Sequence, residues 1–205
     1  MKHEVFTSTS TGMLALVWSP DSRCENDRTI LYLHGAGAFG TGMTGLFEYP
    51  DLPSLLRDGL EVGCRVVIPS CHIGEEWQSP VISSFLHDLE TEYGKPAHGY
   101  DLIGYSRGGR GAYHFAATDP ARIRTLAVIS ARGMPELIPE IRLIPVFICH
   151  GIEDRKVPVI GVRRMYEGLR EGGCNCELLL VHGDHFIVAK VLKDGTIFDW
   201  QESAI

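Results

Sequence analysis

A short glycine-rich turn between an apolar segment and a helical segment constrains the fold of this chain more than any other feature. Leu102 and Ile103 end an apolar segment of strand length, and residues 104–108 then fit the pattern G-x-S-x-G. Residues 110–117 follow with the composition of a helix. So sharp a turn presses the first and last positions of the pattern together, which explains a glycine at each. The sequence therefore predicts a strand, a tight turn and a helix, with Ser106 at the tip of the turn.

Ser106 is the candidate nucleophile of this turn. Its Oγ would be held clear of the sheet at the positive end of the following helix, where developing negative charge is stabilised. A serine hydroxyl is a poor nucleophile at neutral pH and needs a base, which in turn needs a group to orient it. The alternative is a serine that only caps an ordinary helix. The motifs that follow favour the nucleophile.

Apolar segments of strand length alternate with helical segments along the chain. Strands are predicted within 4–19 and at 29–33, 65–69, 125–129, 145–149 and 177–181, and helices at 53–58, 81–93, 110–117 and 162–169. This alternation predicts βαβ units and a mainly parallel sheet flanked by helices, an α/β fold. The 205 residues suffice for a single domain, 1–205, and no insertion is long enough for a large cap domain.

Candidates for the acid and the base follow two later strands. Glu153 and Asp154 come after the strand predicted at 145–149, and His182 and His185 come after the strand at 177–181. Asp154 lies 48 residues after Ser106, and His185 lies 31 residues after Asp154. Each interval is long enough for a strand–helix–strand unit.

Taken together, these segments resemble the α/β-hydrolase superfamily, and within it the small capless serine esterases of the dienelactone-hydrolase-like and predicted-peptidase-like kind. The matching motifs are HGAG at 34–37, GYSRG at 104–108, HGIEDRKVP at 150–158 and HGDH at 182–185. Residues 69–71 with Trp77 also resemble a loop beside the active site of those relatives, with Ser70 where Gln is usual. The resemblance covers roughly residues 29–186 and implies an α/β-hydrolase fold.

The resemblance implies a catalytic triad of Ser106, Asp154 and His185. Glu153 could replace Asp154, but the family pattern places the acid three residues before Val157. His182 could replace His185, but the family places the base a few residues along the loop. Asp184 is expected to be a turn residue, because it is adjacent to the base.

The oxyanion hole is expected to combine the backbone N–H groups of Arg107 and Ala36, with Gly37 as the alternative to Ala36. His34 is expected to shape this loop through a hydrogen bond. Further candidates are the pocket residues Phe39, Trp77 and Tyr105, the surface or pocket residue His72, and the helix residue His114.

Arg107 departs from the family pattern, in which Met, Gln or a small residue is common after the nucleophile. A cation at the start of a helix also opposes the helix macrodipole. One hypothesis is that Arg107, with Arg110 or Arg132, binds a substrate carboxylate. The alternative is a solvated arginine or a structural salt bridge.

Composition limits the partners of this chain. Its 19 Lys and Arg against 26 Asp and Glu give a formal charge of −7, which argues against a nucleic-acid partner. The sequence contains no apolar run of membrane-spanning length, and its first residues do not resemble a secretory signal, so neither a membrane span nor secretion is expected. The six cysteines lack the C-x-x-C spacing of a zinc site. We therefore expect a cytoplasmic protein without a metal or organic cofactor, and we make no prediction of its oligomeric state.

The expected activity is that of a carboxylesterase, a serine hydrolase that cleaves a small-molecule ester through an acyl-enzyme. Thioester or peptide cleavage would use the same residues and stays open. A lyase, an acyltransferase and a catalytically silent binding protein are the remaining alternatives.

Overall fold

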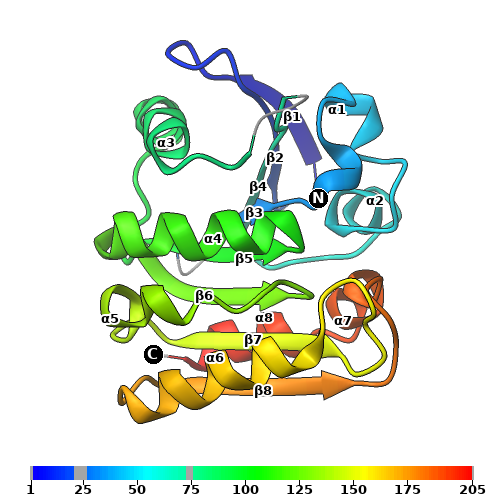
Figure 1. Ribbon diagram of the computed structural model, residues 1–205. Helices are drawn as coiled ribbons and strands as arrows, with labels where there is room; N and C mark the ends of the chain where they lie inside the picture. The colour runs from blue at the N-terminus through cyan, green and yellow to red at the C-terminus, as the bar shows by residue number, and fades with distance from the viewer. Residues whose placement is uncertain (1, 21–26, 73–75, 205) are drawn as a thin grey trace.

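The computed structural model describes residues 2–20, 27–72 and 76–204 (Figure 1). Eight strands form one sheet. They are β1 (Lys2–Thr7), β2 (Leu14–Ser19), β3 (Thr29–Leu33), β4 (Arg65–Pro69), β5 (Tyr100–Tyr105), β6 (Ile123–Ile129), β7 (Val146–Gly151) and β8 (Cys176–Val181).

The sheet is mainly parallel, as predicted. Its strand order is β1-β2-β4-β3-β5-β6-β7-β8, in which only β2 runs antiparallel to its neighbours β1 and β4. The pairs from β4 to β8 are all parallel. The carboxyl ends of these six strands therefore meet at one edge, on the right-hand side of Figure 1.

Helices cover both faces of the sheet. One face carries α3 (Ser79–Tyr93), α4 (Arg107–Thr118), α5 (Ile138–Ile141) and α6 (Val159–Glu171). The other face carries α1 (Gly42–Gly45), α2 (Leu52–Arg57), α7 (Val188–Lys193) and α8 (Thr196–Ser203). Short 3₁₀ helices η1 (Ala36–Ala38), η2 (Pro120–Arg122) and η3 (Pro135–Leu137) lie in the connections.

Strand β3 illustrates why the central strands read as continuous apolar runs. Leu31 and Leu33 point into the core beneath α3 and α4, whereas Ile30 and Tyr32 point into the core on the opposite face. All five residues of β3 are buried. A parallel strand covered on both faces needs apolar side chains at every position rather than at alternate ones.

Several observed elements extend beyond the predicted bounds, and two of these extensions matter for the site. α4 begins at Arg107, directly after Ser106, and β7 continues to Gly151 and so includes His150. No element was predicted after residue 186, where the chain forms α7 and α8 and buries Val191 and Ile197. No helix within the described ranges is both long and apolar enough to span a membrane.

Candidate active site

The turn at Ser106 has the strained geometry that its sequence predicts. Ser106 has φ +53° and ψ −113°, outside the regions that non-glycine residues normally occupy. Its backbone N–H donates to the carbonyl of Ile129 at 2.9 Å, and its own carbonyl accepts from the N–H of Arg110 at 3.2 Å. The turn is thus fixed to β6 on one side and to α4 on the other.

The two glycines of the turn permit a close approach of backbone segments. A Cβ at Gly104 would lie 2.5 Å from the carbonyl oxygen of Gly108. A Cβ at Gly108 would overlap the carbonyl oxygen of Leu33, at the end of β3. The glycine requirement inferred from the sequence is therefore confirmed, and it includes packing against β3 as well as within the turn.

We expect Gly108→Ala to lower the free energy of unfolding by about 3 kcal/mol or more, because no rotamer change can relieve an overlap with backbone. Urea denaturation measures the change. The matched control is Gly161→Ala in α6, where an added Cβ meets no atom within 4 Å. That substitution should be neutral or stabilise the helix by up to about 1 kcal/mol. Similar destabilisation by both variants would contradict this account of the turn.

Three side chains at the carboxyl edge of the sheet form a hydrogen-bonded line. Ser106 Oγ lies 2.8 Å from Nε2 of His185, and Nδ1 of His185 lies 2.7 Å from Oδ2 of Asp154. They come from the connections after β5, β8 and β7. When Nδ1–H donates to the carboxylate, Nε2 is left as the acceptor for the serine hydroxyl. This arrangement can remove a proton from Ser106.

Asp154 is held as a carboxylate by donors on its own loop. Its Oδ1 accepts from the backbone N–H groups of Lys156 at 2.8 Å and Val157 at 2.9 Å. Burial acts to raise the pKa of Asp154, but the hydrogen bonds from Val157, His185 and Lys156 outweigh it and lower the pKa below its usual value. His150 Nε2 lies 2.8 Å from the carbonyl of Val157 and so supports the same loop.

The alternative acid and the alternative base contact each other at the surface. Nδ1 of His182 lies 3.1 Å from Oε1 of Glu153, and both side chains are exposed. Glu153 also accepts the backbone N–H of Gly183. Asp184 accepts the N–H of Phe186 at 2.8 Å, as a turn residue would.

The two expected oxyanion donors each lie at the first residue of a helix. Ala36 is the first residue of η1 and Arg107 is the first residue of α4, so neither N–H has an acceptor within its own helix. Both residues line one cavity with Ser106, as does Gly37. Their role as oxyanion donors stays a prediction.

His34 has the structural role expected of it. Its Nδ1 lies 2.9 Å from the carbonyl of Gly35, and its Nε2 accepts the backbone N–H of Cys71 at 3.2 Å. Burial lowers the pKa of His34 to about 4, so the ring is neutral. The indole N–H of Trp77 donates to the carbonyl of His34 at 3.1 Å. The loop after β3 is thus held in place by the hydrogen bonds of His34 with Cys71 and Trp77.

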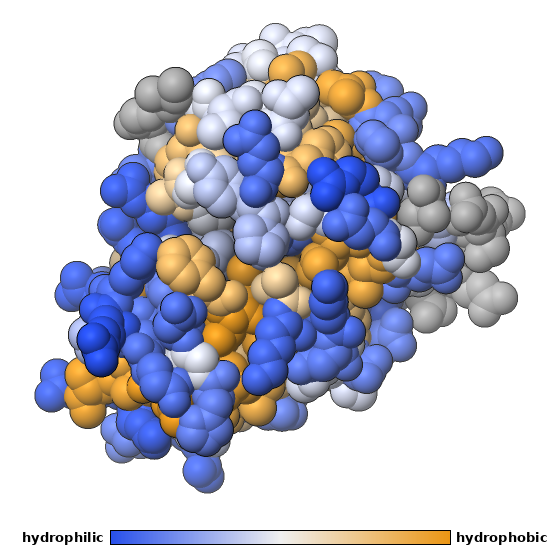
Figure 2. Space-filling view, turned by 90° about the vertical axis from the view of Figure 1, so that its right-hand side faces the viewer, coloured by the Kyte–Doolittle hydropathy of each residue, from blue (hydrophilic) through white to orange (hydrophobic). Residues whose placement is uncertain are grey.

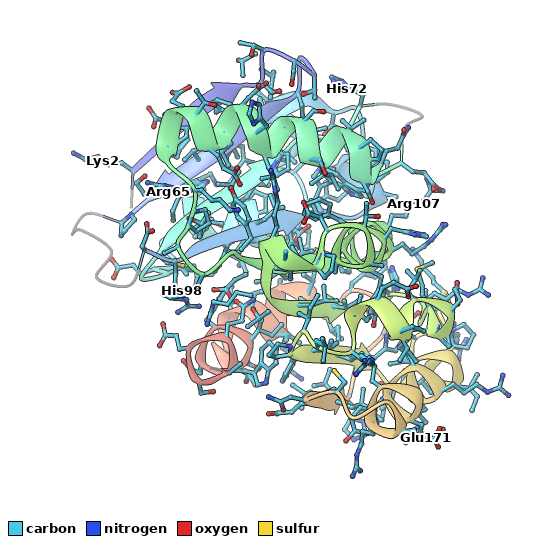
Figure 3. All side chains as sticks on the ribbon, turned by 90° about the vertical axis from the view of Figure 1, so that its left-hand side faces the viewer. Lys2, Arg65, His72, His98, Arg107 and Glu171 are labelled. Carbon is cyan, nitrogen blue, oxygen red and sulfur yellow. The ribbon has the colours of Figure 1, made fainter. Side chains whose placement is uncertain are left out.

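A cavity of about 490 Å³ opens above Ser106. It is lined by residues 35–38, 49–51, 105–107, 156–157, 185–186 and Val188. Figure 2 shows this side of the molecule, where hydrophobic residues lie in the middle of the face between hydrophilic side chains, with further hydrophobic patches at the top and the lower left. Figure 3 shows the opposite edge of the sheet, where Arg65 and His98 lie.

Only one of the three expected pocket residues lines this cavity. Tyr105 does, and its hydroxyl donates to the carbonyl of His185 at 3.3 Å. Phe39 and Trp77 instead line a smaller recess beside α4, because the Trp77 indole is buried against His34. His72 lies in an exposed depression elsewhere, and His114 lies in the recess beside α4.

The sequence also predicts that the loops at 38–50 and 70–80 bound the site. The first loop contributes Ala38, Tyr49 and Pro50 to the cavity wall, whereas no described residue of the second lines it. Sequence reasoning did not single out the other side chains of the wall. Tyr49 and Asp51 come from the segment between η1 and α2, which carries no motif. Lys156 and Val157 lie inside the acid motif, and Phe186 directly follows His185, so proximity to the motifs was the only available signal. Across the described ranges, no three His, Cys, Asp or Glu side chains are grouped to hold a metal ion.

No known family model matches the chain, and a search of curated protein sequences finds no significant match. Solved structures do resemble it. A thermostable esterase superposes with a TM-score of 0.79 and 18% identity, over 98% of this chain but 62% of its own. Est1E from Butyrivibrio proteoclasticus has a TM-score of 0.74 and 15% identity, over 100% of both chains. The thioesterase domain from the curacin biosynthetic pathway has a TM-score of 0.65 and 12% identity, over 97% of this chain and 99% of that one.

The chain has the α/β-hydrolase fold. The sheet, the turn at Ser106 and the positions of Asp154 and His185 after β7 and β8 agree with the arrangement that the motifs implied for this fold. Identities of 12–18% extend the likeness to the fold alone. The activity has to be argued from the site itself.

Proposed function

We propose that this chain is a serine hydrolase that cleaves a small carboxylic ester through an acyl-enzyme. The observation that carries the proposal is the line from Ser106 to His185 to Asp154, with distances of 2.8 and 2.7 Å, at the wall of an open cavity. A cavity of about 490 Å³ has the size of a small-molecule site.

In the first half of the reaction, Ser106 Oγ attacks the ester carbonyl while its proton passes to Nε2 of His185. Asp154 keeps the imidazole in the tautomer that can accept this proton and stabilises the imidazolium. The N–H groups of Ala36 and Arg107 stabilise the oxyanion of the tetrahedral intermediate. The intermediate then expels the alcohol, which takes the proton from His185, and leaves the acyl group on Ser106.

In the second half, water attacks the acyl group on Ser106. His185 removes a proton from the water and later returns it to Ser106 Oγ, so the acid leaves and the enzyme is regenerated. This cycle needs no metal ion or organic cofactor.

The intact hydrogen bonds from Ser106 to His185 to Asp154 weigh against a catalytically silent binding protein. Such a protein can lose any of these three side chains without losing its function. A thioester would react at the same serine, and a thioesterase domain is among the structures that share the fold. Thioester cleavage is therefore the second candidate function.

Hydrolysis of p-nitrophenyl esters of increasing chain length tests the proposal, with an S-phenyl thioester and a p-nitroanilide of the same acyl chain beside them. We expect kcat/KM to be highest for a short ester. A kcat/KM for the thioester more than about tenfold above that of the ester would favour the second candidate, and a folded protein that cleaves none of them would contradict a hydrolase.

A further inference from the structure

Two cations line the cavity above Ser106. Arg107 directly follows the serine, and Lys156 lies two residues after Asp154, so both belong to the segments that carry the reacting groups. Both side chains are exposed. The formal charge of the whole chain is −7, so the positive charge at this cavity is opposite in sign to that of the chain as a whole.

Neither cation has an acidic partner in the described part of the chain. The guanidinium carbon of Arg107 lies 5.9 Å from the centre of the Phe39 ring, and Nζ of Lys156 lies 4.4 Å from the centre of the Phe186 ring. No carboxylate of a described residue lies within 4.0 Å of either cation. Phe186 lines the cavity, so Lys156 lies at the cavity wall, whereas Phe39 lines the recess beside α4. Arg107 lines both the recess and the cavity, and so lies at the border between them. A contact with a ring face leaves the N–H donors of each cation for a ligand.

Asp51 is the one acid among the described residues that line the cavity, and it is only 5% exposed. Its Oδ1 accepts hydrogen bonds from the hydroxyl of Tyr32 and from the backbone N–H of Leu52. Burial raises the pKa of Asp51 to about 6, although both hydrogen bonds oppose that shift. Asp184, on the neighbouring loop, bonds to the N–H of Phe186. Neither acid is paired with Arg107 or Lys156.

We infer that the cavity takes esters that also carry a carboxylate, and that Arg107 and Lys156 are the specificity residues that bind it. This inference rests on the proposed hydrolysis and adds the class of substrate. A guanidinium can hold a carboxylate through two parallel hydrogen bonds, and an ammonium adds a point charge. The carboxylate then lies at the exposed rim while the ester lies at Ser106.

The sequence suggested Arg110 or Arg132 as the second cation beside Arg107, whereas the structure favours Lys156. Arg107 and Arg110 both line the recess beside α4, but Arg110 does not line the cavity, and its Nη1 lies 3.6 Å from Oε1 of Glu76. Arg132 is exposed and is not among the residues that line the cavity. Lys156 takes their place, because the connection after β7 brings it to the same cavity as Arg107.

The test is the ratio of kcat/KM for a carboxylate-bearing ester to that for a neutral ester of the same shape. p-Nitrophenyl hydrogen glutarate and p-nitrophenyl valerate place the difference on the acyl side, whereas 4-carboxyphenyl butyrate and 4-acetylphenyl butyrate place it on the alcohol side. Because each ratio is measured within one variant, a general loss of activity or stability cancels.

For at least one of the two ester pairs, we expect this ratio to fall about three- to tenfold in Arg107→Gln and in Lys156→Met, and further in the double variant. The matched control Arg110→Gln, one turn along α4, should keep the wild-type ratio. Raising the ionic strength to about 0.5 M should increase KM for the preferred charged ester and leave KM for its neutral match unchanged.

A double variant that keeps the wild-type ratio for both ester pairs overturns the inference and leaves the proposed hydrolysis in place. A folded wild-type protein that cleaves none of the four esters overturns the proposed hydrolysis and this inference with it.

Discussion

Ser106→Ala is expected to lower kcat for ester hydrolysis by about 10⁴- to 10⁶-fold, the largest effect that any single substitution in this chain should have. The alanine removes the atom that forms the acyl-enzyme. His185 and the two N–H donors remain, but without the nucleophile they can only assist a slow attack by water. KM should change far less than kcat, because the walls of the cavity stay in place.

The matched control is Ser84→Ala, on the exposed side of α3 and outside the cavity lining. Its kcat should stay within about twofold of the wild type, as expected for a surface substitution. The melting temperature of Ser106→Ala shows whether the variant is folded. A folded Ser106→Ala protein with more than about a hundredth of the wild-type kcat would contradict the role given to this serine.

Asp154→Asn is expected to lower kcat by about 10⁴-fold while the fold persists. The physical reason lies in the donors that surround the carboxylate. The N–H groups of Lys156 and Val157 both point at Oδ1, so the asparagine carbonyl oxygen must take that side. Its NH₂ group then points at Nδ1 of His185, which becomes an acceptor, and the ring proton moves to Nε2. A protonated Nε2 cannot remove the proton of Ser106.

Glu153→Gln is the matched control for the acid, since it changes the neighbouring residue in the same way. Among the described residues, Glu153 pairs with His182 and Gly183 at the surface, so the kcat of this variant should stay within about twofold of the wild type. Should Glu153→Gln lose more activity than Asp154→Asn, the acid would be misassigned.

The sequence predicted the sheet because its central strands are buried on both faces and their apolar runs are unbroken. The resemblance of the motifs to those of the α/β-hydrolases implied that Ser106, Asp154 and His185 act together, and these motifs follow β5, β7 and β8. In a parallel sheet such motifs end at one edge, and the structure brings these three side chains within hydrogen-bonding distance there.

The walls of the cavity could not be predicted in the same way. Trp77 lies close to a recognisable loop, yet its indole N–H points inward and donates to the carbonyl of His34. This orientation depends on a residue 43 positions away in the sequence, so no local pattern predicts it. Tyr49 lies at the end of the 38–50 loop, where no periodicity or motif singles it out, and its ring lies over Gly37 at the cavity wall. Side chains of this kind are placed by tertiary packing, which no local pattern encodes.

The most direct test of the account is the intact mass of the protein after incubation with a fluorophosphonate. We predict a single phosphonyl adduct, located on Ser106 by peptide mapping, absent from Ser106→Ala and formed more slowly in His185→Ala. A folded wild-type protein that gains no adduct, or gains it at another residue, would contradict the claim that Ser106 is the nucleophile.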